Sequence, residues 1–166
     1  MKKRTKYSVR TRERYGKNIE VYYPDTNAVE KLVTMKGPFS FYESVENRKE
    51  CCNIRKVEPL KRALNGEKCW ITGIRREQSE ERRRIHEIEW GDSRKLYKMS
   101  PLYKWTLDEV EKYIKDNNVP YNVLYNKGFV SIGCAPCTRA VQPGDDFRSD
   151  RWWWEHNKNR ECGLHG

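Results

Sequence analysis

Two pairs of cysteines, far apart along the chain, constrain its fold more than any other feature. Cys51 and Cys52 are adjacent, and Cys134 and Cys137 follow in a Cys-x-x-Cys spacing after the intervening 53–133 stretch. Four thiolates gathered from two distant segments suit a soft metal centre. A fifth cysteine, Cys162, stands close to the last residue in a Glu-Cys-Gly-Leu-His context, where a thiol can move and react.

Disulfide bonding is the first alternative to a metal centre. Adjacent residues in a trans peptide lie about 3.8 Å apart at Cα, whereas a disulfide normally spans about 4.4 to 6.8 Å. Cys51 and Cys52 would therefore pair with each other only under strain. The sequence begins Met-Lys-Lys-Arg-Thr-Lys with no apolar stretch behind it, and no run is long enough to cross a membrane. These features predict a cytoplasmic protein, in which paired cysteines more often serve metal or redox chemistry.

The kind of metal centre stays open on spacing alone. Zinc ribbons usually set their two halves about 15 to 20 residues apart, which is much shorter than the 53–133 stretch. A vicinal pair also fits one tetrahedral ion less easily than a cluster, whose iron atoms are more widely spread. Four thiolates around a [4Fe–4S] cluster are a standard arrangement. An iron–sulfur cluster, a zinc ion and unligated thiols are the three alternatives.

Composition limits the core and suggests the charge of a partner. The chain has 166 residues, enough for one domain or a large part of one. Because 36% of the residues are apolar and 35% are charged, the core must be modest, and the six Trp and ten Tyr supply much of it. The net charge of +10 favours an anionic partner such as a nucleotide or nucleic acid. Most single Lys and Arg residues are nevertheless expected to be solvated.

Alternating strand and helix patterns predict an α/β layer fold. Short strands are expected at residues 18–23, 68–72 and 84–90. Helices are expected at residues 26–36, at residues 54–64 with an interruption at Pro59, and after the capping box Thr106-Leu107-Asp108-Glu109. After Gly144 the sequence is polar and aromatic with little periodicity, which predicts a mobile flap more than core.

The two remaining cysteines have different expected roles. A nucleophilic cysteine needs a depressed pKa and exposure, and Cys162 has basic neighbours at Lys158 and Arg160. Its simpler interpretation is a surface thiol. Cys69 lies between Lys68 and Trp70 in an apolar run and is predicted to be a buried core residue.

Five motifs together carry a resemblance to a known enzyme family. They are Glu50-Cys51-Cys52-x-x-Arg55-Lys56-x-Glu58-Pro59-Leu60, Thr72-Gly73-x-Arg75-Arg76-x-Gln78-Ser79, Gly133-Cys134-x-Pro136-Cys137-Thr138-Arg139, Arg151-Trp152-Trp153-Trp154-Glu155 and Glu161-Cys162-Gly163-Leu164-His165. From about Tyr15 to Gly166 the chain resembles the thioredoxin-dependent adenylyl-sulfate reductases. These are the cluster-containing branch of the assimilatory adenylyl-sulfate and phosphoadenylyl-sulfate reductases. The resemblance favours an iron–sulfur cluster over zinc and a nucleophilic Cys162 over a surface thiol.

The resemblance implies a reaction and the residues that perform it. The Cys162 thiolate would attack the sulfur of adenylyl sulfate and release AMP, and thioredoxin or a glutaredoxin-like dithiol would then release sulfite from the S-sulfonated cysteine. Arg83, Arg148 and Arg151 would contact the phosphosulfate, and Lys56 would lie between cluster and substrate. The [4Fe–4S] cluster would be held by Cys51, Cys52, Cys134 and Cys137. The two cysteine pairs favour adenylyl sulfate over phosphoadenylyl sulfate, the alternative substrate.

The implied fold is a partial adenine-nucleotide alpha-hydrolase-like domain of the PP-loop, Rossmann-like class. It would occupy residues 1–144 and carry the cluster ligands, and a flexible tail at residues 145–166 would carry the catalytic cysteine. The family's Gly-rich phosphate loop and a later Asp-Thr-Gly segment are absent from the sequence, and Met1 to Arg14 align with the helix that follows the loop. The N-terminal strands of the sheet are therefore expected to be missing. The chain alone would then reduce adenylyl sulfate poorly or not at all.

Several interpretations of this departure stay open. The chain is a fragment, an inactive remnant, or an enzyme completed by a separate N-terminal segment or by another copy in a homo-oligomer. A different class of function is a basic metal-thiolate module that binds nucleic acid, with the Trp152-Trp153-Trp154 run as a base-stacking surface. Packing of these rings against the core is the favoured alternative. The nucleic-acid hypothesis also leaves Cys162 without a role.

Overall fold

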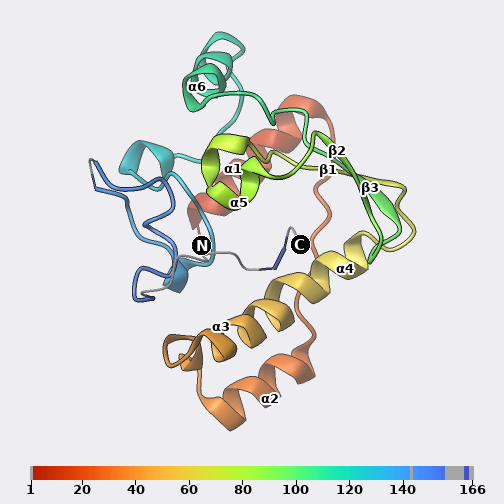
Figure 1. Cartoon of the computed structure of the whole chain (residues 1–166), viewed down its shortest axis with the longest axis vertical. Helices are drawn as coiled ribbons and strands as arrows, with labels where there is room; N and C mark the ends of the chain where they lie inside the picture. The colour runs from red at the N-terminus through yellow and green to blue at the C-terminus, as the bar shows by residue number, and fades with distance from the viewer. Residues whose placement is uncertain (1, 143, 156–162, 165–166) are drawn as a thin grey trace. The chain divides into compact units, whose positions relative to one another are not determined.

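The structure, a computed structural model, describes residues 2–142, 144–155 and 163–164 (Figure 1). The chain divides into two compact units. Unit 1 consists of Met1–Glu20 and Cys69–Trp153, and unit 2 consists of Val21–Lys68 and Trp154–Gly166. Each unit is built from its own elements and has its own buried side chains.

Unit 1 contains a small mixed sheet, which confirms the predicted α/β class. The strands β1 (Cys69–Ile71), β2 (Ile88–Gly91) and β3 (Leu96–Met99) lie in the order β1-β3-β2. β1 runs parallel to β3, and β2 pairs with β3 as an antiparallel hairpin. Leu96 and Lys98 are buried on one face of the sheet, whereas the other face exposes the larger side chains Ile71, Ile88, Trp90 and Tyr97.

Along the chain, the α-helices described in unit 1 come before, between and after the strands of this sheet (Figure 1). They are α1 (Lys2–Tyr15), α5 (Glu80–Arg83) and α6 (Leu107–Asp116). The predicted capping box begins α6: Thr106 Oγ1 accepts from the amide of Glu109 at 3.2 Å, and the Glu109 carboxylate accepts from the amide of Thr106 at 2.7 Å. Arg14 of α1 donates to the carbonyl of Asn117 at 2.8 Å, so α1 is tied to the end of α6.

Unit 2 is helical. It contains α2 (Thr26–Lys36), α3 (Val45–Cys52) and α4 (Glu58–Ala63). The bounds of α2 are those predicted, because Asp25 caps its first turn with a 2.8 Å bond from the amide of Ala28 and Gly37 ends it at a φ of 81°. Lys36 links α2 to α3 through Glu50 at 2.7 Å and Asn47 at 3.0 Å.

A π-helical turn, Asn53–Val57, joins α3 to α4. The amide of Glu58 donates to the carbonyl of Asn53, five residues earlier, instead of the usual four. Pro59 follows at once and has no amide hydrogen to donate, so the helical hydrogen-bond ladder is interrupted at this point. The predicted interruption at Pro59 is therefore confirmed, and it takes the form of a wider turn within a continuous helical run.

Residues from the predicted tail pack on the helices of unit 2. The Trp154 ring lies 4.4 Å from the Tyr42 ring and 6.2 Å from the Phe41 ring, measured between centroids. Glu155 forms a buried ion pair with Arg48 of α3. Breaking such a pair by removing one partner typically costs several kcal/mol, because the other charge stays buried alone.

The structure corrects three local expectations. Residues 18–23 do not form a strand; Val21 and Tyr23 are exposed, and the segment crosses the boundary between the units without a neighbouring strand. Cys69 is exposed rather than buried, because it lies on the uncovered face of β1. The first part of the predicted flap, residues 145–155, includes the completely buried side chains of Asp150 and Trp152. Sequence patterns missed this packing because the segment has no regular period.

Candidate functional site

The first cysteine pair ends helix α3. Ser44 caps the helix by accepting from the amide of Asn47 at 3.1 Å, and Cys51 and Cys52 are its last two residues. Cys52 is buried and Cys51 is half-buried. All five cysteines in the described part of the chain are thiols, so the two adjacent residues do not form a disulfide.

The second pair flanks a tight turn in unit 1. The amide of Cys137 donates to the carbonyl of Cys134 at 3.0 Å, which closes a 3₁₀ turn over Ala135–Cys137. The Thr138 side chain stabilises the turn through two hydrogen bonds to its backbone. Its hydroxyl donates to the Cys134 carbonyl at 2.9 Å and accepts from the Gly133 amide at 3.1 Å. Hydrogen bonds within this short segment therefore hold the turn that carries the two cysteines.

Each unit supplies two of the four predicted cluster ligands. Cys51 and Cys52 belong to unit 2, and Cys134 and Cys137 belong to unit 1. Across the described residues no three His, Cys, Asp or Glu side chains gather into a group that could hold a metal ion. The predicted ligand set therefore stays a prediction from the sequence.

A short segment, residues 148–152, packs beside the Cys134–Cys137 turn. The backbones of Thr138 and Arg151 form an antiparallel bridge, and the amide of Arg139 donates to the Asp150 carbonyl at 3.2 Å. The amide of Trp152 points to the carbonyl of Cys137 at 3.4 Å. Two predicted substrate-binding residues, Arg148 and Arg151, are buried in this segment.

Arg151 is a buried cation with unused hydrogen-bond donors. Its side chain is 6% exposed, and its guanidinium carbon lies 4.6 Å from the centre of the Trp152 ring. In the described part of the chain, Nε and Nη2 of Arg151 have no hydrogen-bond partner. A buried donor without a partner costs about 1 to 3 kcal/mol, and more when it is charged. Such an arrangement is suited to receive an anion.

A buried carboxylate accompanies the arginines. Asp150 is fully buried, and its Oδ2 accepts from the amide of Ser131 at 3.2 Å. Burial raises the pKa of Asp150 from 3.8 to about 6, against the opposing effects of Arg151, the Ser131 amide and Arg148. The segment therefore contains an acidic group whose charge changes in mildly acidic solution.

The other two predicted substrate-binding residues lie in different settings. Lys56 is half-buried within the π-helical turn of unit 2. Arg83 in unit 1 is exposed and forms an ion pair with Glu80 at 2.7 Å. The structure thus brings Arg148 and Arg151 together in one segment, and it places Arg83 on the surface of α5.

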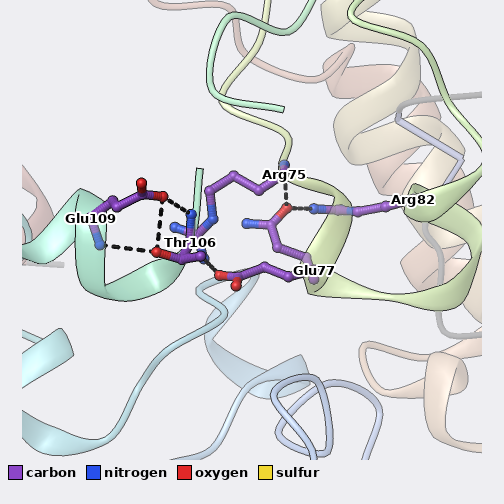
Figure 2. Close-up of polar contacts among 6 residues, drawn as sticks. Arg75, Glu77, Arg82, Thr106 and Glu109 are labelled. Carbon is purple, nitrogen blue, oxygen red and sulfur yellow. Dashed lines mark hydrogen bonds and ion pairs between the residues drawn. The ribbon is translucent and has the colours of Figure 1, made fainter. Parts of the chain in front are cut away.

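A polar network around Arg75 was not predicted from the sequence. The buried Arg75 pairs with Glu77 at 2.9 Å, and its amide donates to Oε1 of Gln78 at 3.2 Å. Arg82 donates to the same Gln78 oxygen, and Figure 2 shows Arg75 and Arg82 converging on it, with Thr106 and Glu109 nearby. Arg82 is half-buried, unlike its neighbour Arg83. The spacing of Arg75, Gln78, Ser79 and Arg82 was the available signal.

The tryptophan run does not form a common stacking surface. Trp152 is completely buried, and Trp154 packs against Phe41 and Tyr42 in unit 2. Trp153 is 43% exposed, with the Arg139 guanidinium 5.2 Å from its ring centre. Packing therefore accounts for two of the three rings, as favoured from the sequence. The predicted nucleophile Cys162 lies outside the described residues.

A family model for the phosphoadenosine phosphosulfate reductase domain matches residues 1–140. The chain belongs to this family. The adenosine 5'-phosphosulfate reductase of Burkholderia cepacia is 53% identical over 156 residues, which cover 94% of this chain and 62% of the relative. The enzyme of the same name from Rhizobium tropici is 45% identical over 155 residues, which cover 93% of this chain and 86% of the relative.

A solved structure supports the same family fold. The phosphoadenylyl-sulfate reductase of Candida auris, in a phosphate complex, is similar with a TM-score of 0.67 and 26% identity. The match covers 85% of this family member and 66% of the solved chain. The family member spans 62% and 59% of the relatives from Burkholderia cepacia and Allochromatium vinosum. Within the described residues, no helix is both long and apolar enough to span a membrane.

Proposed function

We propose that the chain forms the part of an adenylyl-sulfate reductase that carries the arginines and cysteines of the reaction. The observation that carries this proposal is Arg151, a buried guanidinium whose Nε and Nη2 lack partners in the described part of the chain. It lies in a segment bonded to the Cys134–Cys137 turn. The names of the close relatives favour adenylyl sulfate as the substrate over phosphoadenylyl sulfate. Sulfate assimilation in the cytoplasm is the proposed setting.

The proposed reaction has two displacement steps. The thiolate of Cys162 attacks the sulfur of adenylyl sulfate, an S–S bond forms, and the S–O bond breaks as AMP leaves with the electron pair. A thiolate of thioredoxin or of a glutaredoxin-like dithiol then attacks Cys162, and sulfite leaves with the electrons of the S–S bond. The second thiol of the reductant restores Cys162. The reductant ends as a disulfide, so its two thiols supply the two electrons.

The basic side chains would stabilise the charge that moves in the first step. Arg148 and Arg151 would hold the phosphosulfate, because hydrogen bonds from guanidinium to phosphate and sulfate oxygens are short and strong. Lys56 would act from the π-helical turn, and Arg83 would have to exchange its ion pair with Glu80 for the substrate. Of the four, Arg151 has the environment that best fits this role.

The cysteines present fit an iron–sulfur cluster. Cys51, Cys52, Cys134 and Cys137 are thiols, and cluster iron is normally held by four thiolates. One pair ends a capped helix and the other flanks a braced turn, so both are held on ordered backbone. A bound [4Fe–4S] cluster would supply electrostatic and structural support.

The decisive experiment identifies the thiol that receives the sulfonate. The full chain, joined to a complete phosphate-loop segment, is incubated with adenylyl sulfate without a reductant and analysed by intact mass spectrometry. We expect one added sulfonate, removable by thioredoxin, and loss of the adduct in Cys162→Ser with unchanged iron content. An adduct that persists in Cys162→Ser would place the chemistry on another thiol, and Cys69→Ser is the matched control. No adduct in the unaltered protein would reject the proposed function.

A further inference from the structure

Gly133 lies directly before the Cys134–Cys137 turn, and its backbone does not explain why it is glycine. Its φ lies outside the positive range that side chains avoid, so alanine could adopt the same conformation. A Cβ atom built on Gly133 would lie 2.7 Å from Nη1 of Arg151, and closer still to Cζ and Nη2. Real Cβ atoms essentially never approach a neighbour so closely. The space that a methyl group would fill is occupied by the guanidinium.

This contact is distinctive within the described part of the chain. Among the glycines described there, only Gly133 would bring a Cβ atom within 3 Å of a neighbour. Gly91 offers a contrast in the same unit, because its φ is also outside the positive range and its Cβ would meet only the Leu96 carbonyl at 3.5 Å. That distance is an ordinary van der Waals contact.

Packing contacts help to determine where the Arg151 guanidinium lies. It lies against the Gly133 backbone and near the Trp152 ring, while Nε and Nη2 have no hydrogen-bond partner in the described residues. These buried donors have no competing partner among the described residues, so they would gain hydrogen bonds from an anion admitted beside them. Because the guanidinium is the end of a long side chain, it can give way to a methyl group without unfolding the protein. It would then lose its position and keep its charge.

We propose that Gly133 is a positioning residue for anion binding: the missing side chain lets Arg151 lie against the backbone beside Cys134 with its N–H groups available. This inference rests on the proposed function, because it takes the anion to be the phosphosulfate of adenylyl sulfate. Gly133 contacts the arginine, and its proposed effect on the substrate passes through Arg151. Its effect should therefore appear in substrate affinity and should depend on the presence of Arg151.

The test measures single-turnover formation of the S-sulfonated protein at varied adenylyl sulfate, with the protein used for the Cys162 experiment. We expect Gly133→Ala and Arg151→Ala each to raise the half-saturating concentration about tenfold or more, as the loss of a charge-assisted hydrogen bond predicts. The double variant should be no worse than Arg151→Ala. Gly91→Ala should behave like the unaltered protein. The iron content and the melting temperature should stay close to those of the Gly91→Ala control.

The other outcomes separate this inference from the proposed function. If Arg151→Ala weakens binding and Gly133→Ala does not, the role of Gly133 is rejected and the proposed function stands. Additive effects in the double variant, or loss of iron in Gly133→Ala, would show that Gly133 acts on the Cys134 turn and not through Arg151. If Arg151→Ala forms the adduct at normal concentrations, Arg151 does not hold the anion and the inference fails. If no variant and no control forms an adduct, both proposals fail together.

Discussion

At the scale of single residues, Asp150 is a side chain of the candidate site whose charged form is disfavoured by burial. It is fully buried, and only one of its carboxylate oxygens has a hydrogen-bond partner in the described part of the chain. Burial raises its pKa to about 6, although Arg151 and Arg148 favour the charged form. Folding thus favours the protonated acid, which makes stability depend on pH.

The sign of this dependence gives a prediction. A folded pKa of about 6 against 3.8 for the free group means that Asp150 contributes most stability below pH 3.8 and loses this contribution as pH rises through 6. Asp150→Asn resembles the protonated acid and retains an acceptor for the Ser131 amide. The variant should match the unaltered protein near pH 4 and be more stable above pH 7, by up to about 3 kcal/mol at about 1.4 kcal/mol per pKa unit.

Chemical denaturation of both proteins across this pH range measures the difference directly. The difference in unfolding free energy should grow between about pH 4 and pH 6 and then level off. A difference that does not vary with pH would mean that Asp150 is not a buried acid with a raised pKa. Asp92, an exposed acidic residue of the same unit, offers a matched control as Asp92→Asn.

At the scale of elements, α6 shows how a local signal determines a helix. Its capping box supplies acceptors for the amides of Thr106 and Glu109 from within four consecutive residues. Thr106→Ala removes the acceptor for the Glu109 amide and should cost about 1 kcal/mol. We therefore expect about fivefold faster amide hydrogen exchange in α6, measured by mass spectrometry on peptides of residues 107–116. Thr106→Ser keeps the hydroxyl and should exchange like the unaltered protein; equal acceleration in both variants would contradict the role of the cap.

The sequence could predict features that depend on nearby residues, but not features that depend on contacts between distant parts of the chain. The bounds of α2 and the start of α6 depend on caps and spacing within a few residues, and both were predicted correctly. Residues 18–23 have a strand-like composition, but a strand also needs a neighbour in space, which no local pattern can supply. Cys69 was placed in the core because it lies in an apolar run. Its exposure depends on what covers that face of the sheet.

The candidate site also has some features that the sequence could predict and others that depend on contacts between distant residues. The cysteine pairs were visible as motifs, because their residue types and spacing are themselves the signal, whereas the arginines were named from the family resemblance. The contact between Gly133 and Arg151 joins residues that are distant in sequence, and no periodicity marks it. The burial of Asp150 and Trp152 likewise depends on packing against the Cys134–Cys137 turn. Motifs therefore gave the candidate residues, and the fold was needed to show how they are held.

At the scale of the whole molecule, the ligands of the proposed cluster are shared equally between the two units. Unit 1 supplies Cys134 and Cys137, and unit 2 supplies Cys51 and Cys52. A cluster held by all four should therefore depend on both units. A metal held by one pair alone would depend on only one of them.

This arrangement predicts the outcome of serine substitutions. Anaerobically purified protein should be brown and contain about four irons per chain. Changing any one of the four cysteines to serine should strongly reduce the iron, whichever unit it belongs to, whereas Cys69→Ser and Cys162→Ser should retain it. Iron analysis with the visible absorption spectrum gives the readout. One zinc per chain without iron, or loss limited to substitutions in one unit, would contradict a four-thiolate iron–sulfur cluster.

The π-helical turn between α3 and α4 has a consequence for how this chain tolerates changes of length. Its backbone carries one residue more per hydrogen-bonded ring than the helices on either side. Deleting one residue within Asn53–Val57 would let the run close as a regular α-helix. The wider ring and the usual α-helical ring each close about one turn of the helix, so the shortened helix would still present Cys51 and Cys52 on nearly the same side relative to α4. The π-helical turn thus lets this helix accommodate one additional residue while its sulfur atoms keep their direction.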